Sequence, residues 1–111
     1  MYLYVEMWKP RSTWNALSRE QRHEYLSQMS TGIEKMLSSG VQLVGIACND
    51  KEVPDDADFR YIAVWKMPNR GHVHMLEKAV KADGWSNYFE IGNARGQILS
   101  VDQAIEDMVV V

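Results

Sequence analysis

Seven aromatic, charged and amide side chains, spaced along three predicted strands, have the chemistry of a small-molecule site. They are Tyr4, Glu6, Trp8, Tyr61, Trp65, Asn93 and Arg95. Aromatic rings stack on planar molecules, a guanidinium holds a negative charge, and a carboxylate moves a proton. In this hypothesis Arg95 and Asn93 orient a planar anionic or phenolic ligand, Glu6 carries the proton, and the four rings form the walls.

The same residues also fit a protein–protein interface that holds no ligand. Tyrosine and tryptophan supply much of the buried area at interfaces. Glu6 would then form an ion pair with Arg95, Arg60 or Lys66. The residue types alone leave both interpretations open.

Histidines provide a second candidate proton carrier. His72 and His74 lie two positions apart in a predicted helix, which places them about 200° apart around its axis. They therefore cannot share a metal ion as an i, i+4 pair does, and we expect no metal site. An unperturbed imidazole titrates near about pH 6.5, so we retain His74 as a candidate beside Glu6, with a capping or surface role as the alternative.

Composition and charge exclude several classes of function. Twelve basic and fifteen acidic residues give a net charge of −3, which disfavours binding to nucleic acid or to an anionic membrane. Cys48 is the only cysteine, which excludes an internal disulfide and a cysteine-based zinc site and suits a reducing compartment. No stretch approaches the roughly 18 apolar residues of a membrane span. We expect a cytoplasmic protein that has no cofactor.

Hydropathy patterns predict four strands, two helices and a C-terminal extension. The strands are predicted at residues 2–9, 41–48, 59–67 and 90–101. One long helix is expected from the capping box of Ser18 and Gln21 to Gly40, and a second from the N-cap Asn69 to Asp83. Residues 102–111 form the extension, with one or two helical turns capped by Asp102.

This order of elements predicts a ferredoxin-like α+β fold over the single domain 1–111. A four-stranded antiparallel sheet then carries both helices on one face. We expect small residues of the last strand, Gly92, Ala94 and Gly96, beneath the helices. The other face would then carry Tyr2, Tyr4, Trp8, Tyr61 and Trp65. So many rings are not stable in water, and a second copy of the sheet is expected to cover them in a homodimer.

The βαββαβ order, the aromatic outer face, the length of 111 residues and the C-terminal extension resemble the dimeric α+β barrel superfamily. The resemblance implies sheet-to-sheet packing and a cavity between sheet and helices or between sheets. Members include cofactor-free antibiotic-biosynthesis monooxygenases, muconolactone isomerases and haem-degrading or haem-binding proteins. These members differ in chemistry, so the resemblance does not imply one reaction. From the aromatic and charged residues above, the first hypothesis is a cofactor-free monooxygenase or isomerase acting on an aromatic or polyketide-like compound. The alternatives are a non-catalytic ligand-sensing or assembly module and haem binding through one histidine.

Overall fold

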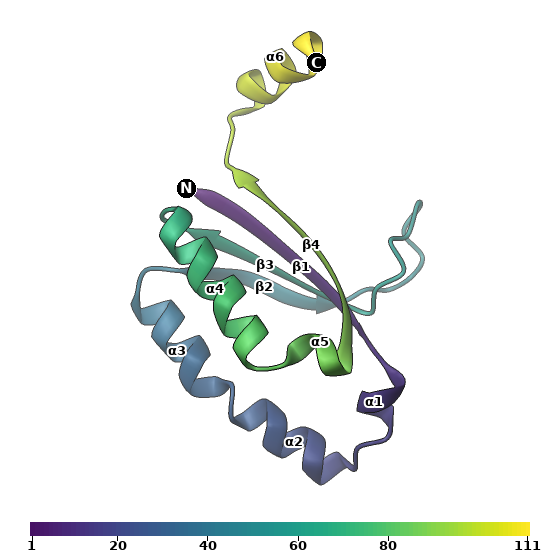
Figure 1. Ribbon diagram of the computed structural model, residues 1–111. Helices are drawn as coiled ribbons and strands as arrows, with labels where there is room; N and C mark the ends of the chain where they lie inside the picture. The colour runs from purple at the N-terminus through teal and green to yellow at the C-terminus, as the bar shows by residue number, and fades with distance from the viewer.

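The computed structural model describes residues 1–111 and contains one four-stranded antiparallel sheet (Figure 1). Its strands are β1 (Tyr2–Pro10), β2 (Gln42–Cys48), β3 (Tyr61–Met67) and β4 (Phe89–Gln97). Their order across the sheet is β2-β3-β1-β4, and every neighbouring pair is antiparallel. This is the strand order of a ferredoxin-like fold, so the predicted α+β class is confirmed.

Six helices complete the chain. They are α1 (Ser12–Asn15), α2 (Arg19–Ser27), α3 (Ser30–Ser38), α4 (Arg70–Ala82), α5 (Trp85–Tyr88) and α6 (Val101–Val110). Figure 1 shows α3 and α4 on the same side of the sheet, and α6 projecting away from the other elements. The helices on this side leave the opposite face of the sheet open.

Helix caps predicted from the sequence are confirmed at two helices and corrected at a third. The side chain of Ser18 accepts a hydrogen bond from the backbone nitrogen of Gln21, and the side chain of Gln21 accepts one from Ser18 in return. Asn69 caps α4. The predicted Asp102 cap of α6 is wrong, because Ser100 forms a complete capping box two residues earlier. A serine with glutamine three residues later satisfies two free backbone nitrogens at once.

The long helix expected before Gly40 is two helices, α2 and α3, separated at Gln28 and Met29. At this break the Ser27 hydroxyl donates to the carbonyl of His23 at 2.7 Å. The Ser30 hydroxyl donates to the carbonyl of Ser27 at 2.9 Å. Such side-chain bonds compete with the backbone ladder of a helix and favour bends. Periodicity alone did not reveal this local competition.

The helices cover the aromatic face of the sheet, which corrects the expectation that this face is open. Tyr4 and Trp65 are only 2% and 5% exposed, and they pack in one cluster with Met36 of α3 and with Val73 and Leu76 of α4. The alternation of side chains along a strand divides them between two faces but does not predict which face packs against the helices. A crossover between parallel strands, such as β1 and β2 here, is right-handed in nearly all proteins. This preference, which alternation does not contain, determines which face the helices cover.

The open face carries small and branched aliphatic residues instead. It includes Leu3, Val5, Met7, Ile62, Val64, Ala94 and Gly96. Gly92 also lies on this face, where the ring of Phe59 covers it: a Cβ added at Gly92 would lie 2.7 Å from the ring. The prediction that Gly92, Ala94 and Gly96 lie beneath the helices is therefore wrong.

Candidate functional site

A cavity of about 320 Å³ lies between the sheet and the helices. Twelve of its fifteen lining residues are hydrophobic, and they come from α2, α3, α4, α5 and three strands. Buried side chains such as Met36, Trp65 and Leu76 form its floor, whereas Leu26, Ile33 and Ile46 are exposed and form its rim. The volume falls at the lower end of the range for small-molecule sites.

Glu6 is the buried ionisable group of this cavity. The residue is 8% exposed, and its Oε1 accepts a hydrogen bond from Trp65 Nε1 at 2.7 Å. Burial raises the pKa of the Glu6 carboxyl above its ordinary value of 4.5, and the hydrogen bond from Trp65 opposes only part of that rise. The protonated form of Glu6 therefore persists to higher pH than in an exposed glutamate. A carboxyl with a raised pKa is suited to taking up and returning a proton.

Aromatic rings form the end of the cavity near Glu6. Trp8 stacks on Tyr61 with centroids 5.6 Å apart, and its edge meets Trp85 at 5.9 Å. Trp85 in turn stacks on Phe89 at 4.2 Å. Sequence analysis placed Trp8, Tyr61 and Trp65 in the site but not Trp85, which lines the cavity from α5.

The charged side chains that line the cavity, Glu6 and Asp83, both carry carboxyl groups. A carboxylate repels an anion, and the repulsion grows as the surroundings lose water. Arg95, expected to hold a ligand's negative charge, does not line this cavity. The arrangement therefore favours a ligand without negative charge over the anionic ligand inferred from the sequence.

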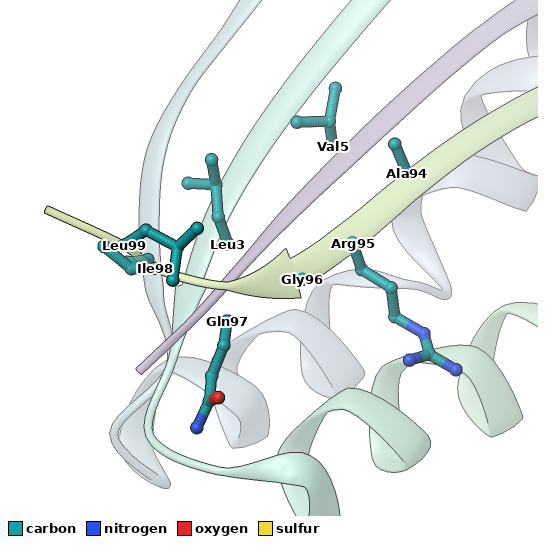
Figure 2. Close-up of a pocket in the computed structure, with 8 residues that line it drawn as sticks. All are labelled: Leu3, Val5, Ala94, Arg95, Gly96, Gln97, Ile98 and Leu99. Atoms are coloured by element: carbon teal, nitrogen blue, oxygen red, sulfur yellow. The ribbon is translucent and has the colours of Figure 1, made fainter. Parts of the chain in front are cut away.

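Arg95, Tyr4 and His74 instead meet at Glu77 of α4. Glu77 Oε2 accepts hydrogen bonds from Arg95 Nε at 3.0 Å and from the Tyr4 hydroxyl at 3.1 Å. His74 Nδ1 lies 3.5 Å from the other carboxylate oxygen. Figure 2 shows the Arg95 side chain extending from β4 toward the helices. The cluster ties α4 to β1 and β4.

The electrostatics of this cluster keep Glu77 ionised. Burial acts to raise the pKa of its carboxyl, but the hydrogen bonds from Arg95 and Tyr4 outweigh it and hold that pKa below 4.5. Burial and the bond to Glu77 raise the pKa of the Tyr4 hydroxyl. Tyr4 therefore stays protonated and serves as a donor. Sequence analysis did not single out Glu77, because it interpreted α4 through its apolar stripe.

The predicted site residues thus fall into three places. Glu6, Trp8 and Trp65 line the cavity, with Tyr61 stacked behind Trp8. Tyr4, His74 and Arg95 lie at Glu77. Asn93 shares the face of Glu6, its register partner on β1, but is exposed and does not line the cavity.

The sequence contains one signal of the cavity that its hydropathy pattern does not reveal, which is Gly32 of α3. A glycine inside a helix costs about 1 kcal/mol relative to alanine, so an interior glycine usually has a local reason. Here a Cβ would meet nothing within 4 Å, and the residue lines the cavity. The missing side chain leaves space in the wall formed by α3.

Two further findings concern ligands and membranes. No group of three or more histidine, cysteine, aspartate or glutamate residues is placed to hold a metal ion. None of the helices has both the length and the apolar character that crossing a bilayer would need.

Comparison with known proteins places the chain in a family. All of residues 1–111 match the family model described as "Family of unknown function (DUF6616)", and the chain belongs to that family. The search of curated proteins found no match. Among solved structures, the chain is similar to the crystal structure of an uncharacterized NIPSNAP domain protein from Burkholderia xenovorans. The two share 10% sequence identity with a TM-score of 0.49, over 91% of this chain and 97% of that one.

Proposed function

We propose that this family member binds a neutral, largely apolar small molecule between the sheet and the helices, and that Glu6 exchanges a proton with it. One observation carries the proposal: Glu6, a residue only 8% exposed whose carboxyl has a raised pKa, lines a cavity that is otherwise mostly hydrophobic. Burying an ionisable group in apolar surroundings is unfavourable for folding. Its presence beside an open volume is typical of a functional group.

The lining supports an aromatic or polyketide-like ligand. Trp8, Trp65 and Trp85 line the cavity, and aromatic side chains supply a large apolar contact area for a ring system. The carboxyl groups of Glu6 and Asp83 disfavour an anion, whereas protonated Glu6 can donate a hydrogen bond to a carbonyl or phenol oxygen. The preferred ligand is therefore a neutral ring system that carries such an oxygen.

The chemistry that suits Glu6 and such a ligand is proton transfer without a cofactor. As an isomerase, ionised Glu6 removes a proton from the carbon beside a carbonyl and returns it to another carbon, with no change in oxidation state. As a monooxygenase, the same deprotonation produces an enolate or phenolate that reacts with molecular oxygen. One oxygen atom then enters the substrate as a new carbonyl, and the other leaves as water.

The alternative function is a non-catalytic ligand-sensing or assembly module. The hydrogen bond from Trp65 to Glu6 favours it, because that bond satisfies the carboxylate without any substrate. In this alternative Glu6 only anchors the ligand.

The assembly we propose is a homodimer in which open sheet faces pack together, as in the dimeric α+β barrel superfamily. Met7, Ile62 and Val64 form a contiguous apolar surface on that face. A surface of this kind is typical of subunit interfaces. We also propose a cytoplasmic location, because the exposed thiol of Cys48 suits a reducing compartment.

Ligand binding is tested with two fluorescent probes that share one ring system. Phenyl-naphthylamine is neutral, whereas anilinonaphthalene sulfonate is the same molecule with a sulfonate added. We expect the neutral probe to bind at least about tenfold more tightly. Gly32→Leu should abolish that preference by filling the cavity, and Thr31→Leu, on the same helix but outside the lining, is the control. Equal binding of both probes to all three proteins would contradict the proposal.

Proton transfer is tested separately by deuterium exchange. β-Tetralone is a neutral aromatic ketone whose acidic C–H protons exchange slowly with heavy water, and NMR follows the exchange. The proposal predicts acceleration by the wild type that increases with pH as Glu6 ionises, and no acceleration by Glu6→Gln although the variant still binds the ketone. Binding without acceleration by the wild type would establish the ligand-sensing alternative.

A further inference from the structure

α6 is an amphipathic helix that contacts little of its own chain. Its apolar positions are Val101, Ala104, Ile105, Met108 and Val109, which form one stripe. Val101 and Met108 are 75% and 65% exposed, and eight of the seventeen exposed large hydrophobic residues lie from Ile98 to the C-terminus. No other element packs extensively against α6. A ten-residue helix is marginal in water without tertiary packing, so this stripe needs a partner surface.

A groove of matching character lies on the open face of the sheet where α6 begins. It has a volume of about 340 Å³, and Figure 2 shows Leu3, Val5 and Ala94 on the side of the sheet away from the helices, with Ile98 and Leu99 at its end. Gly96 forms part of its floor, and a Cβ added there would meet nothing within 4 Å. The groove is aliphatic and has room for side chains from outside.

The charges of the two surfaces are complementary. α6 contains Asp102, Glu106 and Asp107 and no basic residue. Asp102 and Glu106 lie four positions apart, on the same side of the stripe. Beside the groove, Lys66 pairs in register with Leu3, and its ammonium takes part in none of the ion pairs of the chain.

The helix cannot reach the groove of its own chain easily. The backbone nitrogen of Ile98 donates to the carbonyl of Met1 at 2.9 Å, which extends the β4 ladder and directs the chain outward. Only Leu99 and Ser100 separate this bond from α6, and the linker itself lines the groove. Figure 1 shows α6 pointing away from the sheet.

We propose that α6 of each protomer docks in the groove of a second copy of the chain, so that two copies exchange C-terminal helices. The apolar stripe of α6 covers Leu3, Val5, Ala94 and Gly96, and Asp102 or Glu106 pairs with Lys66. A two-fold axis makes the exchange reciprocal, because each copy supplies one helix and one groove. The exchange does not depend on a ligand in the cavity.

Dimer dissociation, measured by analytical ultracentrifugation, tests the apolar contact. Each substitution acts at two symmetric sites, so Ile105→Glu should raise the dissociation constant at least about a hundredfold. Leu37→Glu, also at an exposed aliphatic residue but on α3, should leave the dissociation constant unchanged. A dimer insensitive to Ile105→Glu would overturn the exchange and leave only sheet packing. A wild-type protein that is monomeric at high concentration would overturn both.

Charge reversal tests the polar contact. Lys66→Glu or Glu106→Lys alone should weaken the dimer about three- to tenfold, and combining them in one chain should restore it. The assigned pairing would be overturned if the dimer stayed weak both when Lys66→Glu is combined with Glu106→Lys and when it is combined with Asp102→Lys.

Cross-linking between two different single-cysteine proteins tests the geometry. Both carry Cys48→Ser; one adds Gly96→Cys and the other Met108→Cys. A short bis-maleimide should join the two in a mixture. Linkage of Met108→Cys protein only to itself would show helix pairing with helix and overturn the groove assignment. A third protein carries Gly96→Cys and Met108→Cys in one chain. If this protein forms a cross-link within the monomer while the mixture forms none, α6 folds onto its own chain.

Discussion

The two faces of the sheet carry side chains of the same strands but differ in composition. The face beneath the helices holds large rings and a buried carboxyl, exemplified by Tyr4, Trp65 and Glu6. The open face holds aliphatic and small residues such as Val5, Ala94 and Gly96. Rings fill the gap to a helix layer, whereas small side chains let another surface approach closely. The covered face is therefore completed within the chain, and the open face is available to a partner.

The hollows on the two faces have nearly equal volumes, about 320 and 340 Å³, so size does not distinguish them. Their chemistry does. The covered cavity brings Glu6 together with three tryptophan rings. In the open groove, Arg95 and Gln97 line the site through β4 but extend their side chains toward the other face (Figure 2). We assign ligand binding to the first and helix docking to the second.

The largest loss of stability is expected from Trp65→Ala, which tests whether the covered face forms the core. Removing a buried tryptophan side chain costs about 3 to 5 kcal/mol, and the change also leaves Glu6 without its hydrogen-bond donor. Urea denaturation at pH 7 measures the loss. Trp65→Phe keeps most of the ring and should lose about 1 to 3 kcal/mol through the missing bond. A loss below about 1 kcal/mol for Trp65→Ala would show that the covered face is not the core.

Glu6→Gln is expected to stabilise the protein at pH 7, because it removes the charge that burial disfavours. The pKa of Glu6 is raised in the folded state from its ordinary value of 4.5. Above about pH 4.5 the unfolded chain loses this proton first, so the wild type loses stability as the pH rises toward the folded pKa. Glutamine does not titrate and can still accept the bond from Trp65. The gain should therefore vanish at pH 3, and urea denaturation at both pH values checks it.

A pair of glycine substitutions separates the functions of the two faces. Gly32→Leu should weaken neutral-probe binding at least about tenfold and stabilise the fold by about 1 kcal/mol through helix propensity. Gly96→Leu should leave probe binding unchanged and weaken the dimer. Fluorescence titration and ultracentrifugation of both variants measure these effects. The assignments would be reversed if Gly96→Leu alone abolished probe binding.

The smallest effect is expected from Arg95→Ala. Its ion pair with Glu77 is partly exposed, so the loss should stay below about 1 kcal/mol at pH 7. The pKa of Glu77 lies below its ordinary value in the folded state. The contribution is therefore present above about pH 4.5 and declines as the pH falls through the folded pKa. Probe affinity should not change, whereas a tenfold loss would return Arg95 to the ligand site.

Several features of the candidate site were predictable because they depend on local pattern. Alternation put Glu6, Trp8 and Trp65 on one face, and these three residues line the cavity. The same alternation put Arg95 on that face too, yet its side chain pairs with Glu77. Spacing along a strand determines the face of the sheet on which a side chain lies, but not the residue that it contacts. That residue, here Glu77, belongs to a helix whose position depends on packing.

The sequence by itself determined the order of elements, the caps at Ser18 and Asn69, and the division of each strand into two faces. These features follow from hydrogen bonding and sterics within a few residues of the chain. Only the tertiary structure decided which face the helices cover, that Gly32 opens a cavity there, and that α6 has no surface of its own to pack on. Those outcomes depend on the crossover hand and on contacts between distant segments, which no local pattern encodes.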